Sequence, residues 1–79
     1  MPQVLVNVEV EDAVKQAWRE GKMEEMLSRY EAELTELGWR LLVRASGTEP
    51  LMRVTIWGDD ASAIEAKAEE IADKIKEYK

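Results

Sequence analysis

Two alternating apolar runs joined by a short polar segment constrain the fold of this chain more than any other feature. Residues 39–45 and 51–57 each place large apolar side chains at every second position. The side chains that share one face of these runs are Trp39, Leu41, Val43, Met52, Val54 and Ile56. A period of two predicts two strands, and the short connection predicts that they pair as an antiparallel hairpin.

The connection itself, with the arginine before it, reads Arg-Ala-Ser-Gly-Thr-Glu-Pro over residues 44–50. Arg44 offers a planar fork of N–H donors, Ser46 and Thr48 offer hydroxyl groups, and Gly47 permits positive φ, so that successive backbone N–H groups can converge on one point. This composition suits a loop that holds an anion such as phosphate. The alternative is an ordinary hairpin turn in which the hydroxyl groups satisfy their own backbone.

Two arginines belong to the face of the hairpin opposite its apolar side. If Val43 and Val54 face the core, Arg44 and Arg53 lie together on the other face, close to the loop. Two guanidinium groups so placed repel each other unless something negative lies between them. A bound anion would meet that need, and so would pairing with Glu49 or other carboxylates of the chain.

The remaining elements follow from the spacing of apolar residues and from the glycine and acidic residues at the ends of helices. Residues 3–10 alternate as a half-buried strand. A short helix is predicted to begin at the acidic residues Glu11 and Asp12 and to end at Gly21, and a longer amphipathic helix is predicted over residues 23–37 with Gly38 as its cap. A last helix, over residues 61–78, follows. Either Asp59 or Asp60 is suited to cap that last helix.

This order of strand, helices, strand, strand and helix predicts an α+β two-layer sandwich. Its mainly antiparallel sheet has three strands, or four if a short strand lies between Val10 and Asp12, with the helices on one face. The other face carries Leu5, Asn7, Leu42, Arg44, Arg53, Thr55 and Trp57. That mixture is too polar for a core and too apolar for ordinary surface, so we expect this face to pack on another domain.

Composition narrows the possible functions. The 79 residues suffice for one domain, and they include no Cys and no His. Thiolate nucleophiles, the usual zinc ligands and the usual general base are therefore absent. A net charge of -6, from 11 basic and 17 acidic residues, argues against nucleic acid or an anionic membrane as a partner. With no apolar run of about 20 residues and no signal-like N-terminus, we expect a soluble, cytoplasmic protein.

Two segments resemble a known family. Residues 2–8 read Pro-Gln-Val-Leu-Val-Asn-Val, and residues 42–54 read Leu-Val-Arg-Ala-Ser-Gly-Thr-Glu-Pro-Leu-Met-Arg-Val. Both closely resemble the C-terminal domain of the α-D-phosphohexomutase superfamily, and the element order agrees over essentially the whole chain. The Ser-Gly-Thr-Glu-Pro core is shared with phosphomannomutases and phosphoglucomutases, whereas the flanking residues favour the phosphoglucosamine mutases. Many members have proline where this chain has Ala45.

The resemblance implies the fourth domain of a cytoplasmic enzyme that interconverts glucosamine 6-phosphate and glucosamine 1-phosphate. Residues 1–79 would form one phosphate-binding domain, with a fold similar to that of the TATA-box-binding protein, which closes over the active site. By the same resemblance, Arg44, Ser46, Gly47 and Thr48 would bind the phosphate that is not transferred, and Arg53 would support them.

The resemblance also implies what this chain lacks. The superfamily's phosphoserine loop, its magnesium-binding loop and its sugar-selecting loop have no counterpart here. No catalytic residue, metal ligand or cofactor is therefore expected in the chain, Mg²⁺ belongs to the full-length enzyme, and the isolated domain should be inactive. The expected partners are a sugar phosphate and the other domains of the enzyme. An interaction module that uses the open sheet face is the alternative.

Overall fold

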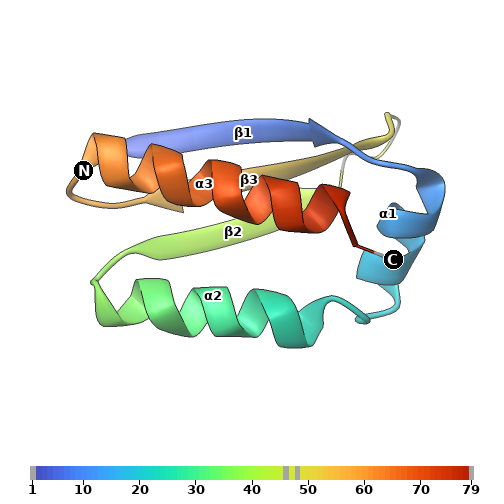
Figure 1. The fold of residues 1–79 in the computed structure, drawn as a ribbon, viewed down its shortest axis with the longest axis horizontal. Coiled ribbons are helices and arrows are strands. Elements are labelled where there is room, and N and C mark those ends of the chain that lie inside the picture. Colours follow the sequence, from blue (N-terminus) through green and yellow to red (C-terminus); the bar gives the residue numbers. More distant parts are fainter. Residues whose placement is uncertain (1, 46, 48, 79) are drawn as a thin grey trace.

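Six elements make up the computed structural model, which describes residues 2–45, 47 and 49–78. They occur in the order predicted from the sequence (Figure 1). They are β1 (Gln3–Glu9), α1 (Asp12–Arg19), α2 (Glu24–Glu36), β2 (Arg40–Ala45), β3 (Leu51–Trp57) and α3 (Ala61–Lys76).

The three strands form one sheet in the order β1-β3-β2, and both pairs are antiparallel. The hairpin of β2 and β3 is confirmed, and β1 pairs with the other edge of β3, which makes β1 parallel to β2. Within the described ranges no fourth strand occurs, because Glu11 is the extended N-cap residue of α1 and Asp12 already belongs to that helix. The predicted α+β two-layer sandwich is confirmed in its three-stranded form.

The helices cover one face of the sheet (Figure 1). Helix α3 packs on β1 and β3, whereas α2 packs on β2. The central strand β3 turns Met52, Val54 and Ile56 toward this layer, and none of the three has any exposed surface. Their alternation with polar neighbours, noted in the sequence, is therefore the division between the core face and the open face. The helices complete the core with Leu34, Ile64, Ala68, Ile71 and Ile75.

Three apolar residues predicted inside elements lie just outside them. Val10 is buried and follows the end of β1; its N–H donates to the Pro50 carbonyl at 2.8 Å, but Pro50 has no N–H with which to return a second bond. Trp39 precedes β2, and its indole Nε1 donates to Asp59 at 2.9 Å. Tyr78 follows α3, and its hydroxyl donates to the Lys22 carbonyl at 2.8 Å. Each prediction was one or two residues too long at that end.

The glycine and aspartate residues predicted at the helix ends lie at those ends in the structure. Gly21 and Gly38 have φ values of 78° and 77° after α1 and α2, which is the left-handed conformation that glycine adopts most easily. Of the two candidate caps for α3, Asp60 accepts the Ala63 N–H at 3.1 Å. In the described part of the chain, no helix is long and apolar enough to cross a membrane.

Candidate anion-binding site

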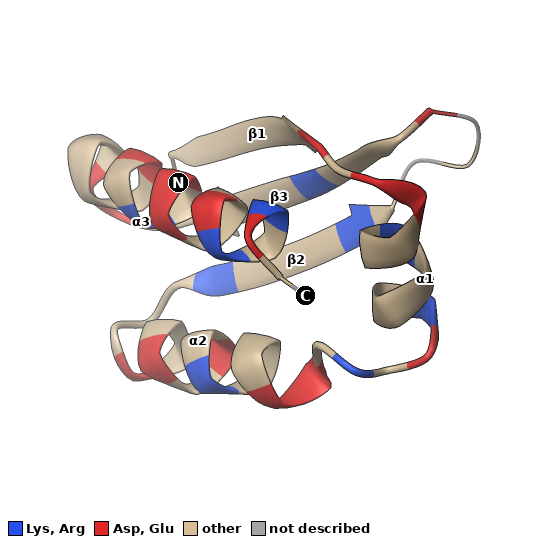
Figure 2. Ribbon diagram, turned by 45° about the vertical axis from the view of Figure 1, so that its right-hand side comes forward, with Lys and Arg blue, Asp and Glu red and all other residues tan. Residues whose placement is uncertain are grey.

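The end of the sheet at which β2 passes into β3 carries two arginines side by side. The strand register places Arg44 of β2 directly opposite Arg53 of β3. Both side chains are exposed and lie on the sheet face that the helices leave open. Figure 2 shows basic segments of β2, β3 and α1 around this end of the sheet. The predicted placement of Arg44 and Arg53 on one sheet face beside the loop is therefore confirmed.

A third side chain extends this row across the sheet. Asn7 of β1 is the register partner of Arg53, and its Oδ1 accepts a hydrogen bond from Arg53 Nε at 3.3 Å. The expected alternative was that carboxylates neutralise the arginines. Over residues 2–45, 47 and 49–78, no ion pair and no carboxylate hydrogen bond involves Arg44 or Arg53. The two like charges thus face solvent without an acidic partner from the described chain.

The loop between the arginines is described only in part, since the predicted ligands Ser46 and Thr48 lie outside the described residues. Gly47 is exposed, and a Cβ built on it would meet no described heavy atom within 4 Å beyond its neighbours. At the other end of the loop, the Leu51 N–H donates to the Glu49 carbonyl at 2.8 Å. Space for a ligand is therefore open at Gly47, whereas the segment that leads into β3 is held by a hydrogen bond between its own residues.

Helix α1 supplies a contact to this loop that the sequence analysis did not single out. Lys15 is only 8% exposed, and its Nζ donates to the Glu49 carbonyl at 2.9 Å. A signal for it existed, because Lys15 lies three residues before Trp18 and beside Val14, on the apolar stripe of a helix whose other charged residues face outward. A charge on such a stripe indicates a buried partner.

The open face continues away from the arginines with apolar residues. Leu5 and Leu42 flank Thr55 from the two edge strands, and they are 46% and 39% exposed. Thr55 between them is only 5% exposed, so neighbouring side chains already cover the middle of the face. The predicted mixture of polar and apolar residues on this face is confirmed.

The side chains at this end of the sheet have the chemistry to bind an anion. The chain has no His or Cys, and the described residues contain no cluster of three acidic side chains that could hold a metal ion. Guanidinium groups beside an open glycine and a rigid strand pair suit a planar or tetrahedral oxyanion. The arrangement can therefore hold and orient an anion.

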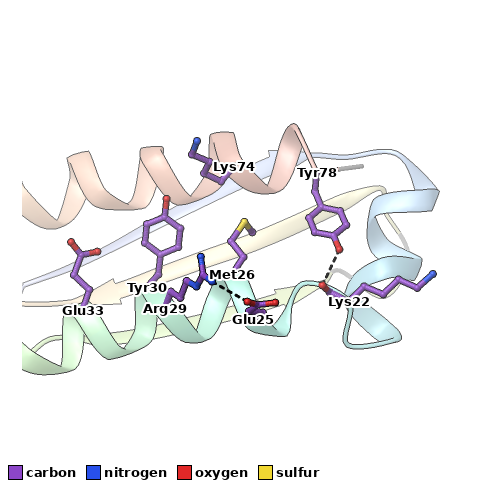
Figure 3. A pocket seen from close by; sticks show the side chains of 8 residues that line it. All are labelled: Lys22, Glu25, Met26, Arg29, Tyr30, Glu33, Lys74 and Tyr78. Atoms are coloured by element: carbon purple, nitrogen blue, oxygen red, sulfur yellow. Dashed lines mark hydrogen bonds and ion pairs between the residues drawn. The ribbon is translucent and has the colours of Figure 1, made fainter.

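A hollow of about 600 Å³ lies between α2 and α3 on the helical side of the sheet (Figure 3). Met26 and Tyr30 point into it from α2, opposite Lys74 of α3 (Figure 3). Burial and the neighbouring Glu70 carboxylate raise the pKa of the Tyr30 hydroxyl above its usual value of 10.0. The basic and acidic side chains that line the hollow partly neutralise each other. One example is the ion pair of Arg29 and Glu25 at 2.9 Å. Among the described residues, this hollow has no set of neighbouring donors comparable to Arg44 and Arg53.

Known proteins match this chain over nearly its whole length. Residues 5–74 match the family described as phosphoglucomutase/phosphomannomutase, C-terminal domain. A phosphoglucosamine mutase of Shewanella baltica is 46% identical over 76 residues, or 96% of this chain, and one of Caldanaerobacter subterraneus is 41% identical over 95% of it. One of Thermotoga neapolitana is 39% identical over 91% of it.

The matched region is a small part of each relative. The chain spans 17% of the length of the Shewanella and Caldanaerobacter proteins and 15% of the Thermotoga protein. The family match covers β2 and β3 in full, β1 from Leu5 onward and α3 as far as Lys74, including the loop and both arginines. The chain therefore belongs to the family of phosphoglucomutase/phosphomannomutase C-terminal domains.

Proposed function

We propose that this chain is the phosphate-binding lid of a phosphoglucosamine mutase. Arg44, Ser46, Gly47 and Thr48 bind the phosphate that is not transferred while glucosamine 6-phosphate and glucosamine 1-phosphate are interconverted. Arg53, held by Asn7, supplies positive charge beside them. The names of the three relatives support the choice of the glucosamine enzyme over phosphomannomutase or phosphoglucomutase.

The observation that carries this proposal is the cross-strand pair of Arg44 and Arg53. Like charges directly opposite each other destabilise a sheet, so a fold that keeps such a pair exposed beside a glycine loop needs another reason for it. Binding of a phosphate dianion between the arginines supplies that reason, because each guanidinium group can donate charge-assisted hydrogen bonds to phosphate oxygens.

The expected strength of this binding suits a lid better than an independent receptor. Charge-assisted hydrogen bonds stabilise by about 1.5–3 kcal/mol each, whereas association costs at least about 4 kcal/mol, apart from ordering of the loop. Three or four such bonds leave an affinity on the order of millimolar for the isolated chain. Within an enzyme that already holds the sugar, the same contacts become intramolecular and serve to position the substrate.

The other parts of the reaction belong to chain outside this domain. The described residues do not fit a magnesium site, so Mg²⁺ and the group that transfers phosphate would come from the other domains of a cytoplasmic enzyme. The open face around Leu5, Thr55 and Leu42 is then the surface available for contact with those domains. Alone, the chain binds phosphate without turnover.

Amide NMR of the ¹⁵N-labelled chain tests the proposal directly. Inorganic phosphate is titrated at constant ionic strength, and we expect shifts concentrated at Ser46 through Glu49 and at the strand ends beside them. Saturation should occur in the millimolar range. A chain whose loop amides do not respond up to tens of millimolar phosphate would contradict the proposal.

Replacement of one arginine gives a sharper test with a matched control. Arg44→Ala should weaken phosphate binding at least tenfold, because it removes a charged donor worth roughly 1.5–3 kcal/mol. Arg40 lies on the same strand and the same face but at the far end, where its guanidinium group is 5.9 Å from the Trp57 ring centroid. Arg40→Ala should leave the affinity unchanged, and equal losses in both variants would indicate a nonspecific effect of charge.

A further inference from the structure

A buried lysine lies beneath the phosphate loop, on an element that does not belong to the hairpin. Among the described residues, Lys15 is the charged side chain that is buried, with 8% of its surface exposed. It is 34 positions from the loop in sequence, yet its Nζ donates to the backbone carbonyl of Glu49 at 2.9 Å. In Figures 1 and 2, α1 lies beside the end of the sheet from which the loop leaves.

Burial of an ammonium group opposes folding unless hydrogen bonds replace its water. An aliphatic side chain at this position could pack beside Val14, which is 6% exposed, without that cost. The charged group therefore needs a partner that an aliphatic residue could not use. The Glu49 carbonyl, which also accepts the Leu51 N–H, is that partner.

The loop is thereby attached to the fold from two directions besides the hairpin itself. Lys15 holds the Glu49 carbonyl from α1, and Val10, just beyond β1, donates its N–H to the Pro50 carbonyl at 2.8 Å. Both bonds reach the short segment between Gly47 and the start of β3. Because each peptide group is planar, a fixed Glu49 carbonyl anchors the Glu49–Pro50 peptide at the end of the loop, and this anchor restricts how the preceding loop residues present their N–H donors.

We propose that Lys15 is a positioning residue of the phosphate site, acting through the Glu49 carbonyl rather than by contact with the ligand. This inference rests on the proposed phosphate-clamp function. By holding the loop in its binding conformation before phosphate arrives, Lys15 lowers the ordering cost of binding. A purely structural lysine would stabilise α1 but leave phosphate affinity unchanged in the folded protein.

The test compares four versions of the ¹⁵N-labelled chain: wild type, Lys15→Met, Lys15→Arg and Val14→Ala. Met retains the apolar length of lysine but cannot donate, whereas Arg restores a charged donor. Val14→Ala loosens the packing of the same helix turn without touching the Glu49 bond, so it is the matched control for α1. Each version is titrated with inorganic phosphate at constant ionic strength, and ¹⁵N relaxation of the Gly47 and Glu49 amides is recorded without phosphate.

We expect Lys15→Met to raise the phosphate Kd about tenfold, as loss of a charge-assisted hydrogen bond would allow, and to increase fast motion at Gly47 and Glu49. Lys15→Arg should recover most of the affinity. Val14→Ala should lower the melting temperature while its Kd remains that of the wild type. This pattern separates positioning of the loop from stability of the helix.

Three results would overturn the inference, and they identify what failed. Wild-type affinity in folded Lys15→Met removes the positioning role but leaves the phosphate clamp intact. Equal weakening in Val14→Ala assigns the effect to helix packing. A wild-type chain that shows no response to phosphate removes the clamp and the inference together.

Should Lys15→Met fail to fold, the wild-type protein still provides a measurement. The ε-ammonium group of Lys15 should give a ¹H–¹⁵N signal that is protected from solvent exchange and that moves when phosphate is added. A Lys15 signal that exchanges as fast as those of exposed lysines would also overturn the inference.

Discussion

At the scale of single residues, Arg44 and Arg53 place two like charges next to each other on the surface of the fold. Arg44 and Arg53 repel each other, and the neutral Asn7 is the side chain that contacts one of them. Because both arginines are exposed and unpaired with carboxylates of the described chain, neither should contribute much to folding. We therefore expect Arg44→Ala to leave the unfolding free energy within about 0.5 kcal/mol of the wild-type value.

Replacement of Asn7 with an acid should act in opposite senses on folding and binding. In Asn7→Asp, a carboxylate takes the place of the amide oxygen that accepts from Arg53 Nε. Such an exposed pair stabilises by about 0–1 kcal/mol, but it competes with phosphate for the same guanidinium group, so we expect affinity to fall about tenfold. Thermal melting and phosphate titration check the two effects.

Asn7→Ala is the control for that substitution, since it removes the acceptor without adding charge. Its phosphate affinity should stay within about threefold of the wild-type value, because a neutral hydrogen bond at the surface contributes little. Unchanged affinity in Asn7→Asp would show that Arg53 lies outside the phosphate site.

Tyr30, on the helical side, yields a prediction about pH. Its pKa is raised, first by burial and then by the carboxylates of Glu70 and Glu33. The folded protein thus disfavours the phenolate more than the unfolded chain does, and the stabilising contribution is complete below pH 10.0 and is lost as pH rises toward the folded pKa. A ¹³Cζ NMR titration should place the Tyr30 midpoint above 10.0.

Two variants check the origin of this shift. Glu70→Gln should lower the Tyr30 midpoint, because it removes a neighbouring negative charge. Tyr30→Phe should lose less stability than the wild type between about pH 9 and about pH 11. A Tyr30 midpoint at or below 10.0 would contradict the assigned environment.

At the scale of elements, the turn from β3 into α3 depends on a glycine for space rather than for backbone freedom. Gly58 is buried, and a Cβ built on it would clash with Ile64 Cγ2 and lie 3.0 Å from carbons of the Trp39 ring. Its N–H donates to the Pro2 carbonyl at 3.1 Å, which ties the chain start to this turn. The junction therefore has little room to move.

We expect Gly58→Ala to destabilise the fold by about 1–3 kcal/mol through overpacking. Ile64→Ala alone should cost about 2–5 kcal/mol by leaving a cavity, but the double variant should cost less than the sum, because removal of Cγ2 frees the space that the new methyl group needs. Chemical denaturation of the three variants measures this coupling. Additive losses would show that the two positions do not compete for space.

At the scale of the whole molecule, the sequence was sufficient for the architecture because each element repeats its period clearly. Val43 and Val54 fixed the inner side of the hairpin, and that assignment placed Arg44 and Arg53 together on the outer side. These inferences succeed because alternation within a strand is a local property. The sheet order is not a local property, because the free edges of β2 and β3 were both open to β1, and the structure pairs β1 with β3.

What the sequence did not yield depends on contacts between distant segments. Lys15 meets Glu49 only after α1 has packed beside the loop, and the ladder ends at Val10 because Pro50 accepts one bond but has no N–H to return. Neither partner is encoded by a local period. The apolar spacing likewise predicted Tyr78 inside the last helix, whereas its hydroxyl group donates to the distant Lys22 carbonyl from a position beyond the helix end. Ends of elements and attachments of loops were therefore the parts that sequence patterns could not determine.

The direction of β1 has a mechanical consequence. The strand runs from Gln3, at the end of the sheet far from the loop, to Glu9 beside it, and its seven residues span about 20 Å. In a longer protein such as the relatives, a domain that precedes this fold would join it at the far end. A rotation of about 10° at that junction would carry the loop through roughly 3.5 Å, more than the tolerance of a hydrogen bond. Under the proposed function, the sheet would act as a lever arm, because a small rotation at its base would move the loop toward or away from a bound phosphate.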